Sequence, residues 1–244
     1  MAQEENKQPI GEHLVALRKI LLRSVAALGI AFVVVFYLAV DLLMGFITGP
    51  IVARGITVIY TEMSAALMTK MKVAFIAGAV VASPYIFWQI WAFIKPALYA
   101  HEKRAFRLTF FAAVGLFLLG VVFCYAAVYF LAVDFFLVAG EDLATPMLAI
   151  DKYVSFLFGF VVPFGLAFEL PVALYITTKM GLTNYQMLAS KRKFVILAVV
   201  VIAAFLTPPD VVSQIMLSIP ILILFELSLL ICKVVKPKAA ETEE

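Results

Sequence analysis

Six long apolar runs follow one another along the chain, separated by short polar links. A helix needs about 20 apolar residues to cross roughly 30 Å of hydrocarbon. The runs are continuously apolar and lack the strict alternation that a membrane β-barrel requires, so they predict helices. We expect a single membrane domain over 1–244, with tails at 1–16 and 233–244. The predicted spans are 21–40, 73–94, 108–133, 153–178, 194–206 and 211–232.

Composition supports lipid as the main solvent of the chain. Apolar residues make up 65% of the sequence and charged residues 14%, against about 25% charged in soluble domains. One small soluble domain could not bury six such helices with so few polar residues left for its surface. The net charge of +3 is small and scattered, which argues against nucleic acid as a partner.

Lysine and arginine divide unevenly between the two sides of the predicted bundle. Fifteen lie in the N-terminal segment, the links after spans 2 and 4, and the C-terminal tail, whereas four lie in the other links. The positive-inside rule therefore predicts that both termini are cytoplasmic. The long first outer link, 41–72, contains prolines, glycines and a stretch with helical character, so we expect a structured loop there.

The last two spans are expected to be short. Span 5 has 13 apolar residues, or roughly 20 Å of helix. Span 6 carries Ser213, Gln214 and Pro220, which weaken the apolar character of its outer half. A short helix is either a local mismatch without a role or a means of thinning the bilayer.

Several polar residues fall inside or beside the predicted spans. Glu169 lies in span 4, where a charged group costs several kcal/mol unless it is neutral, paired or facing water. It is either a neutral carboxyl hydrogen-bonded between helices, a proton relay, or a docking point for a partner helix. Thr207, Asp210 and Gln214 form a second polar group near the outer ends of spans 5 and 6, where Asp210 is also a candidate N-cap. Glu226 is expected to pair with a lysine near the cytoplasmic side.

Glu102 is the single acid in a basic cytoplasmic link that runs from Lys95 to Arg107. An isolated carboxylate among bases is usually a surface ion-pair partner. It also suits a guanidinium, which a carboxylate binds through two parallel hydrogen bonds. The sequence favours no catalysis, metal or cofactor, because His13 and His101 lack metal-ligand spacing and there is no Gly-x-Ser-x-Gly motif.

Four strings, in order along the chain, resemble motifs of the TatC family, the multispanning core of the twin-arginine protein translocase. They are EHLVALR at 12–18, ASPYIFWQIWAFIKPALYAHEKR at 82–104, FGLAFELP at 164–171 and LTPPDVVSQ at 206–214. The resemblance covers nearly the whole chain. It implies a cupped six-helix bundle in the bacterial inner membrane.

The resemblance also implies a function. The family reads signal peptides with two consecutive arginines and exports folded proteins with the proton-motive force, together with single-span TatA- and TatB-type partners. By resemblance, Glu102 contacts the signal arginines and Glu169, Thr207 and Gln214 dock partner helices. The other matched signal-binding positions are Glu12, Arg18, Phe93, Pro96, His101, Lys103 and Arg104, and the matched outer-loop positions are Pro50 and Asp210.

One position departs from the family pattern. The family commonly has a glutamate where this chain has Ala16, and Glu12 lies one helical turn earlier on the same face. Two other functions stay open at this point. One is a proton-coupled small-solute transporter with Glu169 as relay, and the other is an intramembrane enzyme, which the missing nucleophile–base pair disfavours.

Overall fold

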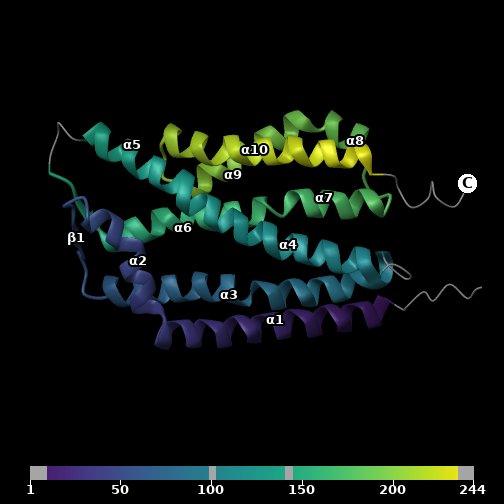
Figure 1. Cartoon of the computed structure of the whole chain (residues 1–244), viewed down its shortest axis with the longest axis horizontal. Coiled ribbons are helices and arrows are strands. Elements are labelled where there is room, and N and C mark those ends of the chain that lie inside the picture. The colour runs from purple at the N-terminus through teal and green to yellow at the C-terminus, as the bar shows by residue number, and fades with distance from the viewer. Residues whose placement is uncertain (1–9, 99–102, 141–144, 236–244) are drawn as a thin grey trace, which may run out of the picture.

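The protein is an elongated bundle of helices (Figure 1), in a computed structural model that describes residues 10–98, 103–140 and 145–235. Six passes run along its length, and two of them are composite helices. The passes are α1 (Ile10–Leu38), α3 (Ala65–Leu98), α4–η1–α5 (Lys103–Phe123, Cys124–Tyr129 and Phe130–Gly140), α6–α7 (Ile150–Ala167 and Leu170–Lys179), α9 (Arg192–Leu206) and α10 (Val211–Val234). This confirms the predicted six-helix membrane protein.

Two expectations about helix length need correction. Helix α10 has 24 residues, about 36 Å of helix, so the prediction of a short sixth span is wrong. The prediction fails because Asp210 caps the start of α10, the Gln214 side chain donates to the Val200 carbonyl of α9, and Pro220 is accommodated inside the helix. Helix α1 already begins at Ile10, so part of the predicted N-terminal tail is helical. Only α9, with 15 residues, is as short as expected.

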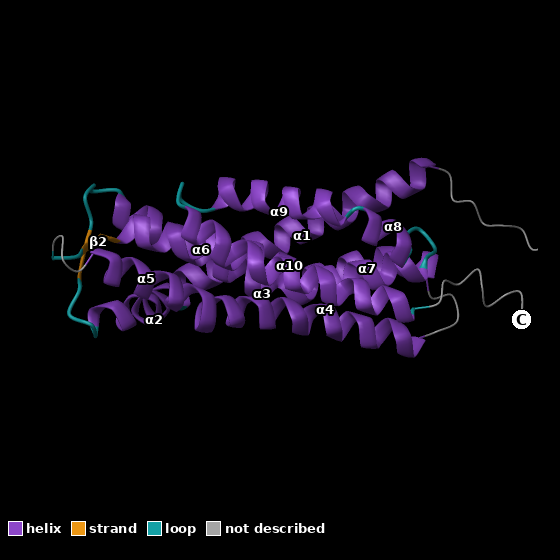
Figure 2. Cartoon of the chain, turned by 90° about the horizontal axis from the view of Figure 1, so that it is seen from above, coloured by secondary structure: helices purple, strands orange, loops and turns teal. Residues whose placement is uncertain are grey.

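The two ends of the bundle differ in structure. The start of α1 and the end of α10 lie at one end, which we call the terminal end (Figure 1). The other end, which we call the sheet end, carries the short helix α2 (Val40–Val52) and strands β1 (Thr57–Ile59) and β2 (Met147–Ala149), seen in Figure 2. A further short helix, α8 (Tyr185–Ser190), lies at the terminal end. The first and the last helix therefore have their outer ends, the start of α1 and the end of α10, on the same side of the bundle, as predicted.

The sheet is an addition to the all-α expectation. Strands β1 and β2 pair in parallel, with Thr57 opposite Met147 and Ile59 opposite Ala149. Each strand has three residues, too short for a periodic pattern to reveal it. The pairing joins two outer links that are distant in sequence, so the outer loops are structured as predicted.

Close backbone approaches fix how the long helices cross. A Cβ atom added at Gly78 of α3 would lie 2.9 Å from the backbone nitrogen of Phe32 in α1. A Cβ at Gly120 of α4 would lie 2.8 Å from the Phe164 carbonyl oxygen in α6. Small residues let membrane helices approach to this distance and gain dispersion contacts. The glycines thus dock α1 on α3 and α4 on α6.

Two tyrosines hold the short helix α2 against the bundle. Pro50 inside α2 has no N–H to donate to the Phe46 carbonyl one turn earlier. The Tyr125 hydroxyl, from the π-helical segment η1, donates to that carbonyl at 3.0 Å. Tyr153 of α6 donates to the next carbonyl, Ile47, also at 3.0 Å. The proline thereby creates an acceptor that ties the outer loop to the spans.

Candidate functional site

The segments of the predicted signal-peptide site meet at the terminal end of the bundle. Helix α3 ends at Leu98 and α4 begins at Lys103, and this junction lies at the same end as the start of α1 (Figure 1). Glu102 and His101 lie outside the described residues. The side chains of Glu12, Pro96, Lys103 and Arg104 also lie outside the described part, although their backbones are helical.

Two members of that site are described together with their side chains. Arg18 is exposed on α1, and Phe93 is half-buried near the end of α3. Beside them the structure adds a residue that sequence analysis missed. Trp91 is 3% exposed and packs in a cluster with Ala113 of α4 and Ile176 of α7. This cluster fixes the end of α3 relative to α4 and α7. In the sequence, the one available sign of it was a tryptophan near the end of an apolar run.

Glu169 lies at a break in the fourth pass, between α6 and α7. Pro171 provides no N–H for the Ala167 carbonyl, so the regular ladder stops there. The chain makes a tight turn in which the Glu169 N–H donates to the Leu166 carbonyl at 3.1 Å, and α7 then restarts with Glu169 as its N-cap residue. The proline thus sets both the break and the position of the acid within the pass.

The carboxyl group of Glu169 has an unsatisfied acceptor. Its Oε1 atom is buried and has no hydrogen-bond partner among the residues that the structure describes. Its neighbour in the turn is aromatic, since Phe168 is 8% exposed and packs against Phe123 with the two rings tilted by 43° and their centres 5.6 Å apart. An unpaired buried polar atom costs about 1–3 kcal/mol. The described residues therefore do not supply the interhelical hydrogen bond that one interpretation of Glu169 required.

The second polar group, at the outer ends of α9 and α10, is bonded to nearby backbone. The Thr207 hydroxyl donates to the Ala203 carbonyl at 2.9 Å, and the Gln214 amide donates to the Val200 carbonyl at 3.0 Å. Asp210 caps α10 by accepting from the Ser213 N–H at 2.6 Å, as predicted. Gln214 therefore links α10 to α9, and only one oxygen of Asp210 is occupied, since its Oδ2 is buried without a described partner.

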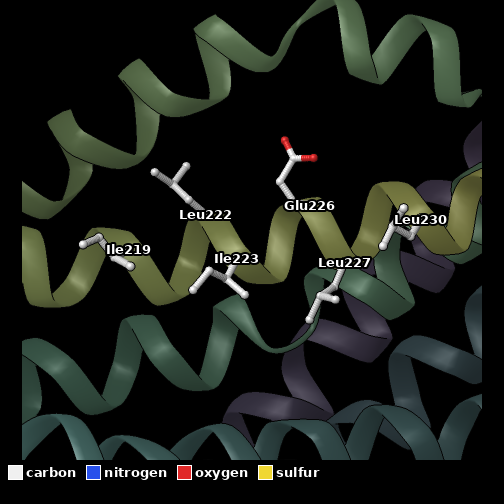
Figure 3. A pocket seen from close by; sticks show the side chains of 6 residues that line it. All are labelled: Ile219, Leu222, Ile223, Glu226, Leu227 and Leu230. Atoms are coloured by element: carbon white, nitrogen blue, oxygen red, sulfur yellow. The ribbon is translucent and has the colours of Figure 1, made fainter.

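Glu226 pairs with an arginine rather than with the expected lysine. Arg192 Nη2 donates to Glu226 Oε2 at 2.9 Å, and Arg192 Nε lies 2.8 Å from Oε1. Figure 3 shows the carboxylate projecting from α10 on the side away from Leu227. The pair joins the start of α9 to α10, and Glu226 is the polar member of a shallow apolar hollow of about 390 Å³.

Sequence analysis also missed the polar contacts that assemble the sheet end. Arg54 forms an ion pair with Asp134 at 2.7 Å, and Lys70 pairs with Asp41 at 2.5 Å. Pro50, expected to shape the outer loop, lies inside α2 and creates the acceptor used by Tyr125. Partners so distant in sequence leave no local pattern, although the aromatic residues near the outer ends of spans 3 and 4 were a weak signal.

Fold and site together define a class: a six-pass α-helical membrane protein with a basic terminal end and, within one pass, an acid whose buried oxygen has no partner among the described residues. The family described as Sec-independent protein translocase protein (TatC) matches residues 12–220. The chain is 40% identical over 236 residues to the "Sec-independent protein translocase protein TatC" of Carboxydothermus hydrogenoformans, covering 96% of this chain and 97% of the relative. It is 34% identical to that of Escherichia coli, covering 98% and 94%.

Solved structures agree with the sequence comparisons. A structure described as "Crystal Structure of Twin Arginine Translocase Receptor- TatC" superposes with a TM-score of 0.84 at 38% identity, covering 90% of this chain and 97% of that one. The chain therefore belongs to the TatC family. It is a multi-pass component of the Tat protein translocase in the bacterial inner membrane, and it works with other subunits of that translocase.

Proposed function

We propose that the chain is the signal-peptide receptor and core subunit of its translocase. It binds the two consecutive arginines of a signal peptide at the terminal end, which the lysine and arginine distribution assigns to the cytoplasm. Together with single-span partners it then exports folded proteins with the proton-motive force. The observation that carries this proposal is the meeting of three motif segments, from α1, α3 and α4, at one end of the bundle.

Glu102 is the proposed counter-charge for the signal arginines. A guanidinium binds a carboxylate through two parallel hydrogen bonds, which gives directional recognition that a lysine ammonium cannot reproduce. Glu12 is the proposed second acid, in place of the family residue that is Ala16 here. Arg18, Phe93, Pro96, His101, Lys103 and Arg104 form the proposed surround, with Arg18 exposed and Phe93 half-buried.

Glu169 is the proposed docking point for the single-span partners of TatA and TatB type. Its support is the buried Oε1 atom without a partner among the described residues. A polar side chain on a partner helix would supply the missing hydrogen bond inside the membrane. Thr207 and Gln214 extend this proposed surface at the sheet end. Since both already donate to α9 carbonyls, they would offer a partner only their remaining acceptor or donor atoms.

The receptor proposal is tested by cross-linking a precursor with an Arg-Arg signal to the chain in membranes that contain its partners. We expect Glu102→Ala to reduce cross-linking at least tenfold, because truncating one partner of a charge pair costs about 2–5 kcal/mol. The matched control is Glu62→Ala, which removes an exposed acid at the sheet end. A Lys-Lys precursor serves as the negative substrate. Cross-linking of the Arg-Arg precursor that survives Glu102→Ala unchanged would remove Glu102 from the site.

The solute-transporter interpretation is disfavoured by the family assignment, because the matched relatives are described as protein translocase subunits. A cheap measurement separates the two functions. The chain alone in proteoliposomes is expected to show no proton-coupled uptake of small solutes, whereas export of a folded reporter in cells depends on it.

A further inference from the structure

A cavity of about 1380 Å³ opens at the sheet end of the bundle, away from the proposed signal-peptide site. This volume exceeds the roughly 300–1,000 Å³ of most small-molecule pockets. Its walls come from α5, α6 and the three outer links. The apolar side chains lining it include Val133, Phe136, Leu137, Leu148 and Phe156.

Charged groups of both signs line the same cavity. Arg54 and Lys152 contribute cations, and Asp210 contributes a carboxylate. The Lys152 side chain is 84% exposed and lies 3.9 Å from Asp151, so its ammonium keeps free donors. Arg54 uses Nη1 for Asp134, which leaves other N–H groups of its guanidinium for an additional acceptor.

One carboxylate oxygen of Asp210 has no donor among the described residues. Its Oδ1 caps α10, whereas its buried Oδ2 accepts no hydrogen bond from any described residue. A buried carboxylate oxygen costs free energy until a donor reaches it. The cavity therefore combines cations that suit a phosphate, an acceptor that suits an ammonium N–H, and apolar walls.

We propose that this cavity binds a phospholipid with a primary-amine headgroup, phosphatidylethanolamine, from the outer leaflet. The phosphate lies between Arg54 and Lys152, the ammonium donates to Asp210 Oδ2, and the acyl chains lie along Phe136, Leu137 and Phe156. The location supports a lipid, because the cavity lies where the spans end and the outer links begin, and lipid headgroups lie around the ends of membrane spans.

The headgroup assignment predicts that the cavity binds lipids with different headgroups with different affinities. The purified full-length chain in detergent is titrated with phosphatidylethanolamine, phosphatidylcholine or phosphatidylglycerol, and bound lipid is counted by native mass spectrometry. We expect phosphatidylethanolamine to bind about tenfold more tightly than the other two, because phosphatidylcholine has no N–H to donate and the hydroxyl groups of phosphatidylglycerol carry no positive charge to pair with the carboxylate. Equal binding of the three lipids would overturn the proposal.

Two variants connect the preference to the cavity. Asp210→Asn keeps the helix cap, since asparagine caps as well as aspartate, and is expected to remove the preference for phosphatidylethanolamine over phosphatidylcholine. Lys152→Gln is expected to weaken both lipids several-fold, with Lys19→Gln on α1 as the matched exposed control. If Asp210→Asn retains the full preference, the ammonium is not bound there and the assignment fails.

A photoreactive phosphatidylethanolamine distinguishes the lipid from other occupants. Its adducts are expected on peptides that contain Phe136 or Leu137 rather than on the exposed α1 residue Ile30. Adducts spread evenly over both regions would indicate bulk lipid only. A protein–protein cross-link from a cysteine introduced at Leu137, in place of lipid adducts, would assign the cavity to a second chain. Either result overturns the proposal.

Discussion

At the scale of single residues, prolines decide where backbone acceptors become available. Pro50 leaves the Phe46 carbonyl without its helical donor, and Tyr125 from a different pass donates to it. Pro171 leaves the Ala167 carbonyl without a donor and turns the chain at Glu169. In both cases the missing N–H interrupts the helical hydrogen bonds, which allows Tyr125 to bond α2 and allows the turn that holds Glu169.

The hydrogen bond from Tyr125 to the Phe46 carbonyl of α2 predicts that the effects of substituting Tyr125 and Pro50 depend on each other. Tyr125→Phe removes the donor to Phe46 and is expected to lower the free energy of unfolding by about 0.5–1.5 kcal/mol. In a Pro50→Ala background the new N–H can bond the same carbonyl, so the same substitution is expected to cost clearly less. The measurement is a double-mutant cycle of thermal stability in detergent.

The control for this cycle is Tyr37→Phe, a tyrosine that is 78% exposed on α1. It is expected to change stability little in either background. Additive costs of Tyr125→Phe and Pro50→Ala would show that the two residues do not share the Phe46 acceptor.

At the scale of elements, glycines set the helix crossings. The α1–α3 and α4–α6 contacts depend on backbones that approach closely, because lipid provides little hydrophobic drive for helices to associate. Gly78 lies directly against the Phe32 backbone, whereas Gly115 of α4 has no atom within 4 Å of an added Cβ. Gly78 is therefore needed for a close contact between two helices, whereas no helix contact among the described residues requires Gly115 to be a glycine.

Identical substitutions at these glycines should have opposite effects. Gly78→Ala is expected to destabilise the protein by about 1–3 kcal/mol, because a backbone must move to accept the methyl group. Gly115→Ala is expected to be neutral or stabilising by up to about 1 kcal/mol, because it removes the helix penalty of glycine. Thermal unfolding of the two variants side by side checks this. Equal stability of the two variants would contradict the assigned crossing contact.

At the scale of the whole molecule, one pass of the bundle is shorter than the hydrocarbon layer is thick. Helix α9 has 15 residues, about 22 Å, against roughly 30 Å of hydrocarbon, so the bilayer must adapt beside it. Its side chains are largely exposed, and Ala203 is its buried residue. The exposed α9 and the buried Oε1 atom of Glu169, which has no partner among the described residues, are the two features that the proposed partner helices would contact.

Partner association provides the test at this scale. Glu169→Ala is expected to reduce co-purification of TatA- and TatB-type partners several-fold, because the partner's polar group loses its acceptor. Glu169→Gln, which keeps an acceptor oxygen, is expected to retain part of the association. Glu62→Ala is the matched acid-removal control. Unaltered co-purification with Glu169→Ala would exclude Glu169 from the docking surface.

The sequence predicted most of the fold, whereas the roles of the proposed site residues are still untested. The spans, the common side of both chain ends, the Asp210 cap and the short α9 followed from hydropathy, charge and local capping rules. The length of α10 was misjudged because Ser213 and Gln214 are polar in sequence, whereas in the fold the Ser213 N–H donates to the Asp210 cap and the Gln214 side chain donates to the Val200 carbonyl. The roles proposed for Glu102 and Glu169 stay predictions.

The sequence by itself determined the number of passes, the common side of the first and last helix ends and the order of the motifs. Hydropathy and charge are properties of each segment, so they can be read without knowing how the segments pack. The tertiary structure alone decided the parallel strand pair, the tyrosine clamp on α2, the Arg192–Glu226 pair and the cavity at the sheet end. Each of these joins groups that are far apart in sequence. Their contact depends on how whole helices cross, which no local pattern encodes.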